Sequence, residues 1–205
     1  MVKPDFKPKD LTSEKKLWDI YLASRRIPFS RFNVITTAIV FLLLTVNSWL
    51  TTQPISETIE IVRKLSDTGL AVTLSTLGFL LAGFTIFATV SQPSLSLRMA
   101  EIPHPVSGLS YLKHNYFIFL RVFIYYLLFS LFCLIIVMFC HKGGLIPLLA
   151  SLSPYPDEVK FALAKISYVL LFTGYYFLIM QLKSFIFNIY HAVMTSLRWK
   201  AEGYE

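Results

Sequence analysis

Four long apolar runs constrain what this chain can fold into more than any other feature of its sequence. They cover about residues 32–50, 69–91, 115–140 and 161–190, and about 20 apolar residues suffice for a helix to cross the hydrocarbon core of a bilayer. Charged residues make up 15% of the chain and the mean hydropathy is +0.60, whereas a soluble domain typically carries about 25% charge. In lipid, backbone polar groups must bond within the protein, which favours helices. The sequence therefore predicts an all-α, polytopic membrane protein whose four-helix transmembrane bundle occupies 32–190.

Short amphipathic helices are expected at the membrane surfaces. In the basic N-terminal segment 1–31, Leu17, Trp18, Tyr21 and Leu22 fall on one helical side, after an N-cap at Ser13. This pattern fits a helix lying on anionic lipid with its tryptophan at headgroup level, and it fits equally a helix that packs on protein. Residues 51–68 repeat apolar side chains at helical spacing, which predicts a second short helix before a span capped at Asp67.

Basic residues are unequally distributed among the segments between the spans. Segment 1–31, the link 92–114 and the tail 191–205 together hold twelve Lys and Arg residues, whereas the other two links hold Arg63, Lys64, Lys142 and Lys160. Lys and Arg accumulate in cytoplasmic loops. We therefore expect 1–31 and the tail 191–205, and with them both termini, to be cytoplasmic.

Groups that catalysis or ion coupling would need inside a membrane are missing from the four runs. The runs contain no Asp, Glu or His in their apolar core, although buried ionisable residues mark most intramembrane sites. The four histidines have no spacing that suits a metal. Cys133 and Cys140 lie two helical turns apart, which is too far for a disulfide within one helix. We expect no catalytic residues, no metal, no cofactor and no direct nucleic acid binding, and therefore no enzyme.

The second run carries a continuous stripe of small residues. At spacings of three and four they occupy one helical face: Ala71, Ser75, Gly78, Ala82, Thr85 and Thr89. Small residues let membrane helices approach closely. The stripe predicts a helix-packing or oligomer interface, with the partner either another span or another subunit. Lining of a pore by Ser75, Thr85 and Thr89 is a further possibility.

Basic residues at the cytoplasmic boundary form a second candidate site. They are predicted to contact anionic lipid or an acidic partner, and comprise Arg25, Arg26, Arg31, Arg98, Lys113, Arg121 and Lys183. Arg121 and Lys183 lie about two turns inside their runs, so snorkelling of their long side chains to the headgroups is the alternative. Hydroxyls in mid-membrane seek hydrogen-bond partners. We therefore expect the Tyr125, Tyr126, Tyr175 and Tyr176 side chains to bond across the third and fourth spans.

The layout of the chain and one run of residues resemble a known family. The run LSTLGFLLAGFTIFATVSQPSLSLRMAE, from Leu74 to Glu101, together with the size, four spans and basic N-terminus, resembles KwaA, the membrane subunits of the Kiwa anti-phage defence systems. The resemblance implies a homo-oligomeric protein of the bacterial inner membrane that senses phage attack. It also implies a cytoplasmic, DNA-binding partner, KwaB, which carries the downstream activity.

Two functions from different classes are compatible with these patterns. A membrane sensor or scaffold that oligomerises and recruits a soluble cytoplasmic partner is favoured by the charged cytoplasmic surface, the small-residue stripe and the missing chemistry. A pore or channel subunit that depolarises the membrane is the alternative. Ion flux through purified protein in liposomes distinguishes the two.

Overall fold

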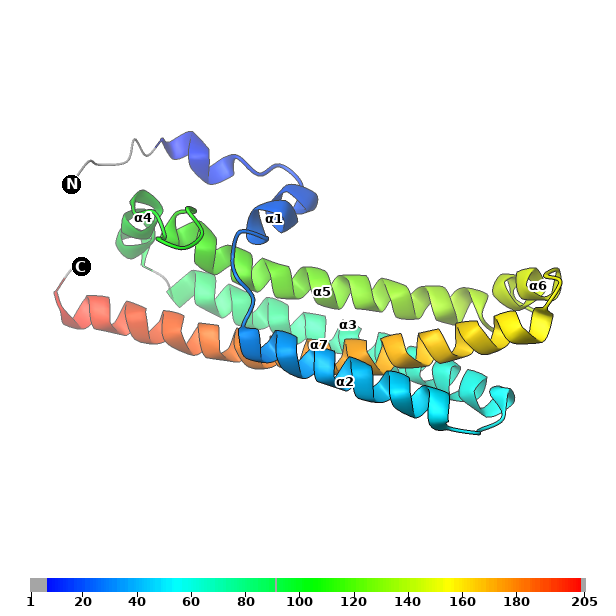
Figure 1. The fold of residues 1–205 in the computed structure, drawn as a ribbon. Helices are drawn as coiled ribbons and strands as arrows, with labels where there is room; N and C mark the ends of the chain where they lie inside the picture. The colour runs from blue at the N-terminus through cyan, green and yellow to red at the C-terminus, as the bar shows by residue number, and fades with distance from the viewer. Residues whose placement is uncertain (1–6, 91, 204–205) are drawn as a thin grey trace. The chain divides into compact units, whose positions relative to one another are not determined.

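A computed structural model describes residues 7–90 and 92–203 of the chain, of which 82% are helical. A 3-10 turn, Pro8–Thr12, precedes the helices. Figure 1 shows these in chain order: α1 (Leu17–Ser24), α2 (Arg31–Leu50), α3 (Ile55–Val90), α4 (Pro93–Glu101), α5 (Tyr111–Phe139), α6 (Leu145–Ser151) and α7 (Pro156–Ala201). Between residues 7–90 and 92–203 the only strand-like pairing is one isolated bridge, Pro103 with Ser110.

Four of these helices are long and apolar enough to cross a membrane, as the sequence predicts. They are α2, α3, α5 and α7, with mean hydropathies of 1.7, 2.0, 2.7 and 1.6 over their most apolar windows. Helix α3 has 36 residues and α7 has 46. Since a bilayer core is crossed by about 20 residues, both are long enough to continue well beyond it.

The helix boundaries differ from the sequence predictions in several places, and α5 begins at Tyr111, before the predicted start at about 115. Helix α3 begins at Ile55, so the predicted amphipathic helix and the second span are one helix, and Asp67 lies inside it instead of capping it. Ser13 is also not an N-cap, because α1 begins at Leu17 and Asp19 accepts the backbone N–H of Lys16 at 3.0 Å. Helix α7 extends past both ends of the predicted run 161–190. Residues 1–6, Ser91 and 204–205, which belong to predicted segments, lie outside the described residues.

The described residues form two compact units. Unit 1 contains 7–29, 78–90, 92–125 and 181–203, and unit 2 contains 30–77 and 126–180. Helices α3, α5 and α7 contribute to both, whereas α1 and α4 belong to unit 1 and α2 and α6 to unit 2. Unit 1 contains a group of packed aromatic rings centred on Phe119. Its ring centroid lies 4.7 Å from that of Phe87 and 5.3 Å from that of Phe185.

Polar side chains join the helices of unit 2 around an apolar cluster of Val62, Cys133, Ile136 and Leu171. The Ser130 hydroxyl donates to Thr73 Oγ1 at 2.7 Å. The Tyr126 hydroxyl donates to the Leu178 carbonyl at 3.2 Å, which is the bond expected between the third and fourth spans. The Tyr175 hydroxyl instead reaches α3, where it donates to the Leu65 carbonyl at 2.8 Å. Each bond satisfies a polar group whose burial in apolar surroundings would otherwise cost free energy.

Two glycines in unit 2 stand where helices approach most closely. A Cβ built on Gly174 of α7 would overlap the ring of Phe129 of α5. One built on Gly69 of α3 would overlap the Tyr175 hydroxyl and meet the Cys133 sulfur at 2.9 Å. Only a residue without a side chain fits at these positions, in keeping with the use of small residues in membrane helix packing.

The predicted stripe of small residues does not pack against the chain's own helices. All six of its residues are exposed, and among the described residues no atom lies within 4 Å of a Cβ built on Gly78. Helix α3 instead buries a neighbouring face that carries Val62, Ser66, Thr73, Leu80 and Phe87. The sequence left two partners open for the stripe, another span of this chain or another subunit. Because the stripe is exposed, the first of these is not observed among the described helices.

We expect Gly174→Ala to destabilise the protein and Gly78→Ala, its matched control, to leave it unchanged or more stable. Both substitutions gain about 1 kcal/mol of helix propensity, but only Gly174→Ala overpacks a filled site, which typically costs about 1–3 kcal/mol. The free energy of unfolding in detergent micelles measures the difference. Equal changes for the two variants would contradict the close approach of α7 to Phe129.

Candidate functional site

The candidate site lies in unit 1, where α1 and α4 pack beside parts of α3, α5 and α7. Helix α1 packs through Ile20 and Ala23 on a small apolar cluster of Ile27, Leu109 and Phe117. Its other apolar residues face outward, with Leu17, Trp18 and Leu22 exposed by 50%, 62% and 46%. The helix therefore packs on protein with one side, which is one of the two alternatives left open by the sequence, and its other apolar side is exposed. Contact of that side with lipid stays a prediction.

Arg121 of α5 fixes the segment that follows α1. Its side chain is buried, and Nη1 donates to the carbonyls of Ser24 at 3.1 Å and Ile27 at 2.7 Å. The guanidinium also lies 4.5 Å from the centroid of the Phe29 ring. Ser24 is the last residue of α1, whose final carbonyls have no partner within the helix, and a cation is favourable at that end.

This burial corrects the prediction for Arg121. The sequence places the residue at the membrane boundary, in contact with lipid headgroups or a partner, but its charge is directed to the backbone of its own chain. An arginine inside an apolar run signals that a partner is needed, because a buried charge without one is very costly. The sequence does not say which carbonyls will supply it. Among the described residues its Nε has no hydrogen-bond partner.

Lys113 is a second basic residue whose charge is used within the chain. Its Nζ lies 2.6 Å from a Glu14 carboxylate oxygen and donates to the Ser13 hydroxyl at 2.6 Å. Both charged side chains are largely buried, with exposures of 15% and 17%. Burial acts to raise the pKa of Glu14, but hydrogen bonds from Lys113 and Ser13 outweigh it and hold that pKa below its usual value. Lys113 therefore anchors the N-terminal segment instead of presenting a free cation.

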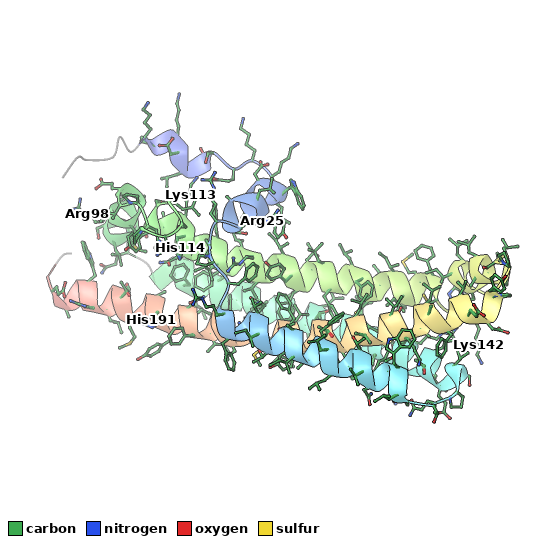
Figure 2. The ribbon with its side chains drawn as sticks, in the orientation of Figure 1. Arg25, Arg98, Lys113, His114, Lys142 and His191 are labelled. Atoms are coloured by element: carbon green, nitrogen blue, oxygen red, sulfur yellow. The ribbon has the colours of Figure 1, made fainter. Side chains whose placement is uncertain are left out.

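The remaining predicted basic residues are exposed. Arg25 and Arg26 follow α1, and Lys183 lies on α7. Arg98 of α4 is exposed and forms a surface ion pair with Glu101 at 3.0 Å. Arg31 is also exposed and belongs to unit 2. Figure 2 labels Arg25, Arg98 and Lys113 on their elements of unit 1.

Two histidines that sequence spacing does not connect lie against each other, His104 on the link between α4 and α5 and His114 in the first turn of α5. The rings of His104 and His114 stack with centroids 3.7 Å apart and planes 8° from parallel. His114 Nδ1 shares a hydrogen bond of 2.9 Å with the Ser107 hydroxyl, and the Val106 N–H donates to His104 Nδ1 at 3.3 Å. The turn that brings them together uses Gly108, with φ of +68°. Gly108 is the only sign of this turn in the sequence, because glycine adopts the left-handed conformation readily.

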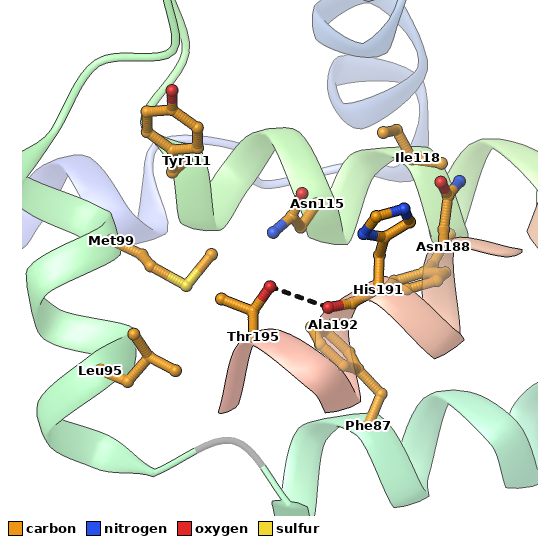
Figure 3. A pocket seen from close by; sticks show the side chains of 11 residues that line it. Phe87, Leu95, Met99, Tyr111, Asn115, Ile118, Asn188, His191, Ala192 and Thr195 are labelled. Carbon is orange, nitrogen blue, oxygen red and sulfur yellow. Dashed lines mark hydrogen bonds between the residues drawn. The ribbon is translucent and has the colours of Figure 1, made fainter. Parts of the chain in front are cut away.

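A pocket of about 270 Å³ opens among α3, α4, α5 and α7 of the same unit. Figure 3 shows Asn115, His191 and Thr195 around a common space that Met99 faces from α4. Phe87 and Leu95 supply apolar surface. The Thr195 hydroxyl donates to the His191 carbonyl at 2.8 Å, so it is engaged with the backbone and not with the imidazole.

The pocket combines an apolar wall with hydrogen-bonding groups. Among the residues that the structure describes, the side-chain amides of Asn115 and Asn188 have no hydrogen-bond partner. An amide can donate and accept at once, so the pair suits a ligand that carries both kinds of group beside an apolar part. The sequence gives no sign of this pocket, because its residues come from four separate helices.

Metal ligands and relatives add no further assignment. Within 7–90 and 92–203, no group of three or more His, Cys, Asp or Glu side chains is arranged to hold a metal ion. Comparison with models of known families, with curated proteins and with solved structures gave no match to this chain. A functional proposal therefore rests on the residues and contacts described above.

We expect Arg121→Met to release the segment after α1. The substitution keeps apolar bulk but removes two hydrogen bonds from a charged donor, each contributing about 1.5–3 kcal/mol. Backbone amides of residues 20–29 should then exchange hydrogen faster, and the free energy of unfolding should fall. Arg26→Met, which changes an exposed arginine nearby, is the control and should change stability by less than about 0.5 kcal/mol. Unchanged protection in Arg121→Met would show that the contact does not hold the segment.

Acid should loosen the contact between Glu14 and Lys113. Because the folded-state pKa of Glu14 is lowered, the contact stabilises the fold fully above the ordinary carboxyl pKa of about 4.3. That contribution is lost as pH falls through the lower folded-state value. Hydrogen-exchange protection factors of residues 13–17, corrected for intrinsic rates, should decrease over this range in the parent protein. Glu14→Gln should show weak protection with no such dependence, and a parallel pH profile in both would contradict the assignment.

Proposed function

We propose that this chain is a four-pass membrane protein with both termini in the cytoplasm, which acts as a sensor or scaffold and recruits a soluble partner. The four long apolar helices support insertion. The unequal distribution of Lys and Arg supports the orientation, because positive residues favour the cytoplasmic side. In this arrangement the N-terminal segment, α4 with its flanking links, and the end of α7 belong to the cytoplasmic surface.

The observation that carries the proposal is the ordered packing of these cytoplasmic segments in unit 1. Arg121 and Lys113 tie the N-terminal segment to α5 through backbone and carboxylate contacts. The polar-lined pocket opens in the same unit, and Arg25 and Arg98 are exposed there. A fixed surface with a pocket and exposed arginines suits protein recognition, since arginine is enriched at interfaces and buried pockets hold the residues that dominate binding.

The exposed small-residue stripe supports assembly with a second copy. Gly78 and Ala82 leave space beside α3, and small residues allow another membrane helix to approach the backbone. A homo-oligomer of this kind agrees with the resemblance to the membrane subunits of anti-phage defence systems. The same resemblance suggests that the recruited partner binds DNA and performs the downstream step.

A pore is the second candidate, and the exposed hydroxyls of the stripe favour it. Ser75, Thr85 and Thr89 are all exposed on α3. Each donates to a carbonyl of its own helix, at 2.9, 2.9 and 3.0 Å, which leaves oxygen lone pairs for water or cations. Flux of ions through the purified protein in liposomes would support this candidate over the scaffold.

We expect Arg25→Glu combined with Arg98→Glu to abolish partner recruitment while the protein still inserts and folds. Both arginines are exposed, and charge reversal opposes an acidic partner. Lys113 is excluded from this variant because its substitution would also release Glu14. Pull-down of soluble proteins from cells that produce each form is the measurement, and recruitment by the parent should weaken with salt.

The control is Lys64→Glu, which reverses an exposed charge on the opposite side of the proposed topology. It should leave recruitment unchanged. If the double variant recruits as the parent does, Arg25 and Arg98 do not belong to the docking surface. If Lys64→Glu loses recruitment to the same degree, the effect is one of net charge and not of a local surface.

A further inference from the structure

Unit 2 contains a cavity whose lining differs from that of the pocket in unit 1. Its volume is about 330 Å³, and it lies among α3, α6, α7 and the chain that follows α5. Ile59, Val62, Ile146 and Leu163 give it an apolar interior. The volume falls within the range of about 300–1,000 Å³ that is typical of small-molecule sites.

Three basic residues also line this cavity, namely Arg63, Lys142 and Lys160. Of the described residues that line it, none is Asp or Glu. The nearest ion pair joins Lys160 to Asp157 at 4.0 Å, and that carboxylate is 92% exposed. Since like charges at one site repel each other, an anion bound among the three cations would relieve the repulsion.

A backbone carbonyl holds the Arg63 side chain, and a tight turn places the backbone of Lys142. Arg63 Nε donates to the Cys140 carbonyl at 2.7 Å, just beyond the end of α5, which holds the guanidinium at the cavity. Lys142, labelled in Figure 2, lies on a tight turn that the Gly144 N–H closes onto the His141 carbonyl at 2.9 Å. Gly143 permits that turn with φ of +79°. The guanidinium of Arg63 is therefore held at the cavity by the fold, and the turn places Lys142 at its lining.

We infer that this cavity binds an anionic phospholipid, with an acyl chain in the apolar interior and the phosphate among Arg63, Lys142 and Lys160. Charge complementarity selects the anion, and the apolar lining selects an amphiphile over a soluble phosphate. Arginine pairs well with phosphate because its planar fork can donate two parallel hydrogen bonds. The inference rests on the proposed membrane insertion only for the source of the lipid, and it concerns residues that the recruitment surface does not use.

The test uses the purified full-length chain in a neutral detergent, so that it needs neither a bilayer nor a soluble partner. Dihexanoyl phosphatidylglycerol, dihexanoyl phosphatidylcholine and glycerol 3-phosphate are added separately, and binding is followed by native mass spectrometry. The parent should bind the phosphatidylglycerol at least about tenfold more tightly than the phosphatidylcholine. Glycerol 3-phosphate, which lacks acyl chains, should bind far more weakly. Equal binding of the two lipids, or equal binding of glycerol 3-phosphate, would overturn the inference.

The matched variants separate this site from general charge attraction. Lys142→Gln combined with Lys160→Gln should weaken phosphatidylglycerol binding roughly thirtyfold, since each basic residue near an anionic lipid contributes about fivefold. Lys64→Gln removes an exposed charge of α3 that does not line the cavity and should leave binding unchanged. Equal loss in both variants, or none in the double variant, would contradict the site. Partner recruitment should persist in the double variant, so failure of either proposal is visible without the other.

Discussion

The need to satisfy polar groups in apolar surroundings governs this structure at every level. A backbone N–H or C=O group left without a partner in lipid costs several kcal/mol, so long apolar segments fold as continuous helices. Side chains obey the same rule. The hydroxyls of Ser130, Tyr126 and Tyr175 all find oxygen partners on neighbouring helices. Each contributes little net stability on average, about 0.6 kcal/mol in membranes, but together they favour one register over alternatives that would leave these groups unpaired.

Arg121 shows how the same requirement connects a long apolar helix to the segment that follows α1. Its charge is placed among apolar side chains of α5, and its partners are the carbonyls of Ser24, the last residue of α1, and of Ile27, which follows the helix. The guanidinium therefore gains hydrogen-bond acceptors, and the carbonyl at the end of α1 gains a charged donor. Lys113 and Glu14 add a second contact of this kind. In consequence residues 7–29 are an ordered part of unit 1, and the proposed partner would meet a fixed surface.

Small residues have opposite consequences on two faces of α3. On the buried face, Ser66, Gly69 and Thr73 admit side chains of α5 and α7 to close range. On the exposed face, Gly78 and Ala82 leave space that no other described part of the chain fills. Both faces have small residues at helical spacing, so the pattern alone does not separate them. The distinction depends on where Phe129, Cys133 and Tyr175 are directed by the packing of the other helices.

The sequence by itself determined the four long helices and their approximate places, because hydropathy and backbone hydrogen bonding are properties of each segment alone. It also identified the residues in need of partners, such as Arg121 and Tyr126. It did not determine that α3 continues through Asp67, since polar helical turns can precede an apolar run without a break. Which face of α3 is buried, which carbonyls receive Arg121, the stacking of His104 on His114 and the cavity beside Arg63 were decided only by tertiary structure. Apart from the histidine pair, which a single link brings together, these features join residues far apart in the chain, and packing geometry chooses their partners.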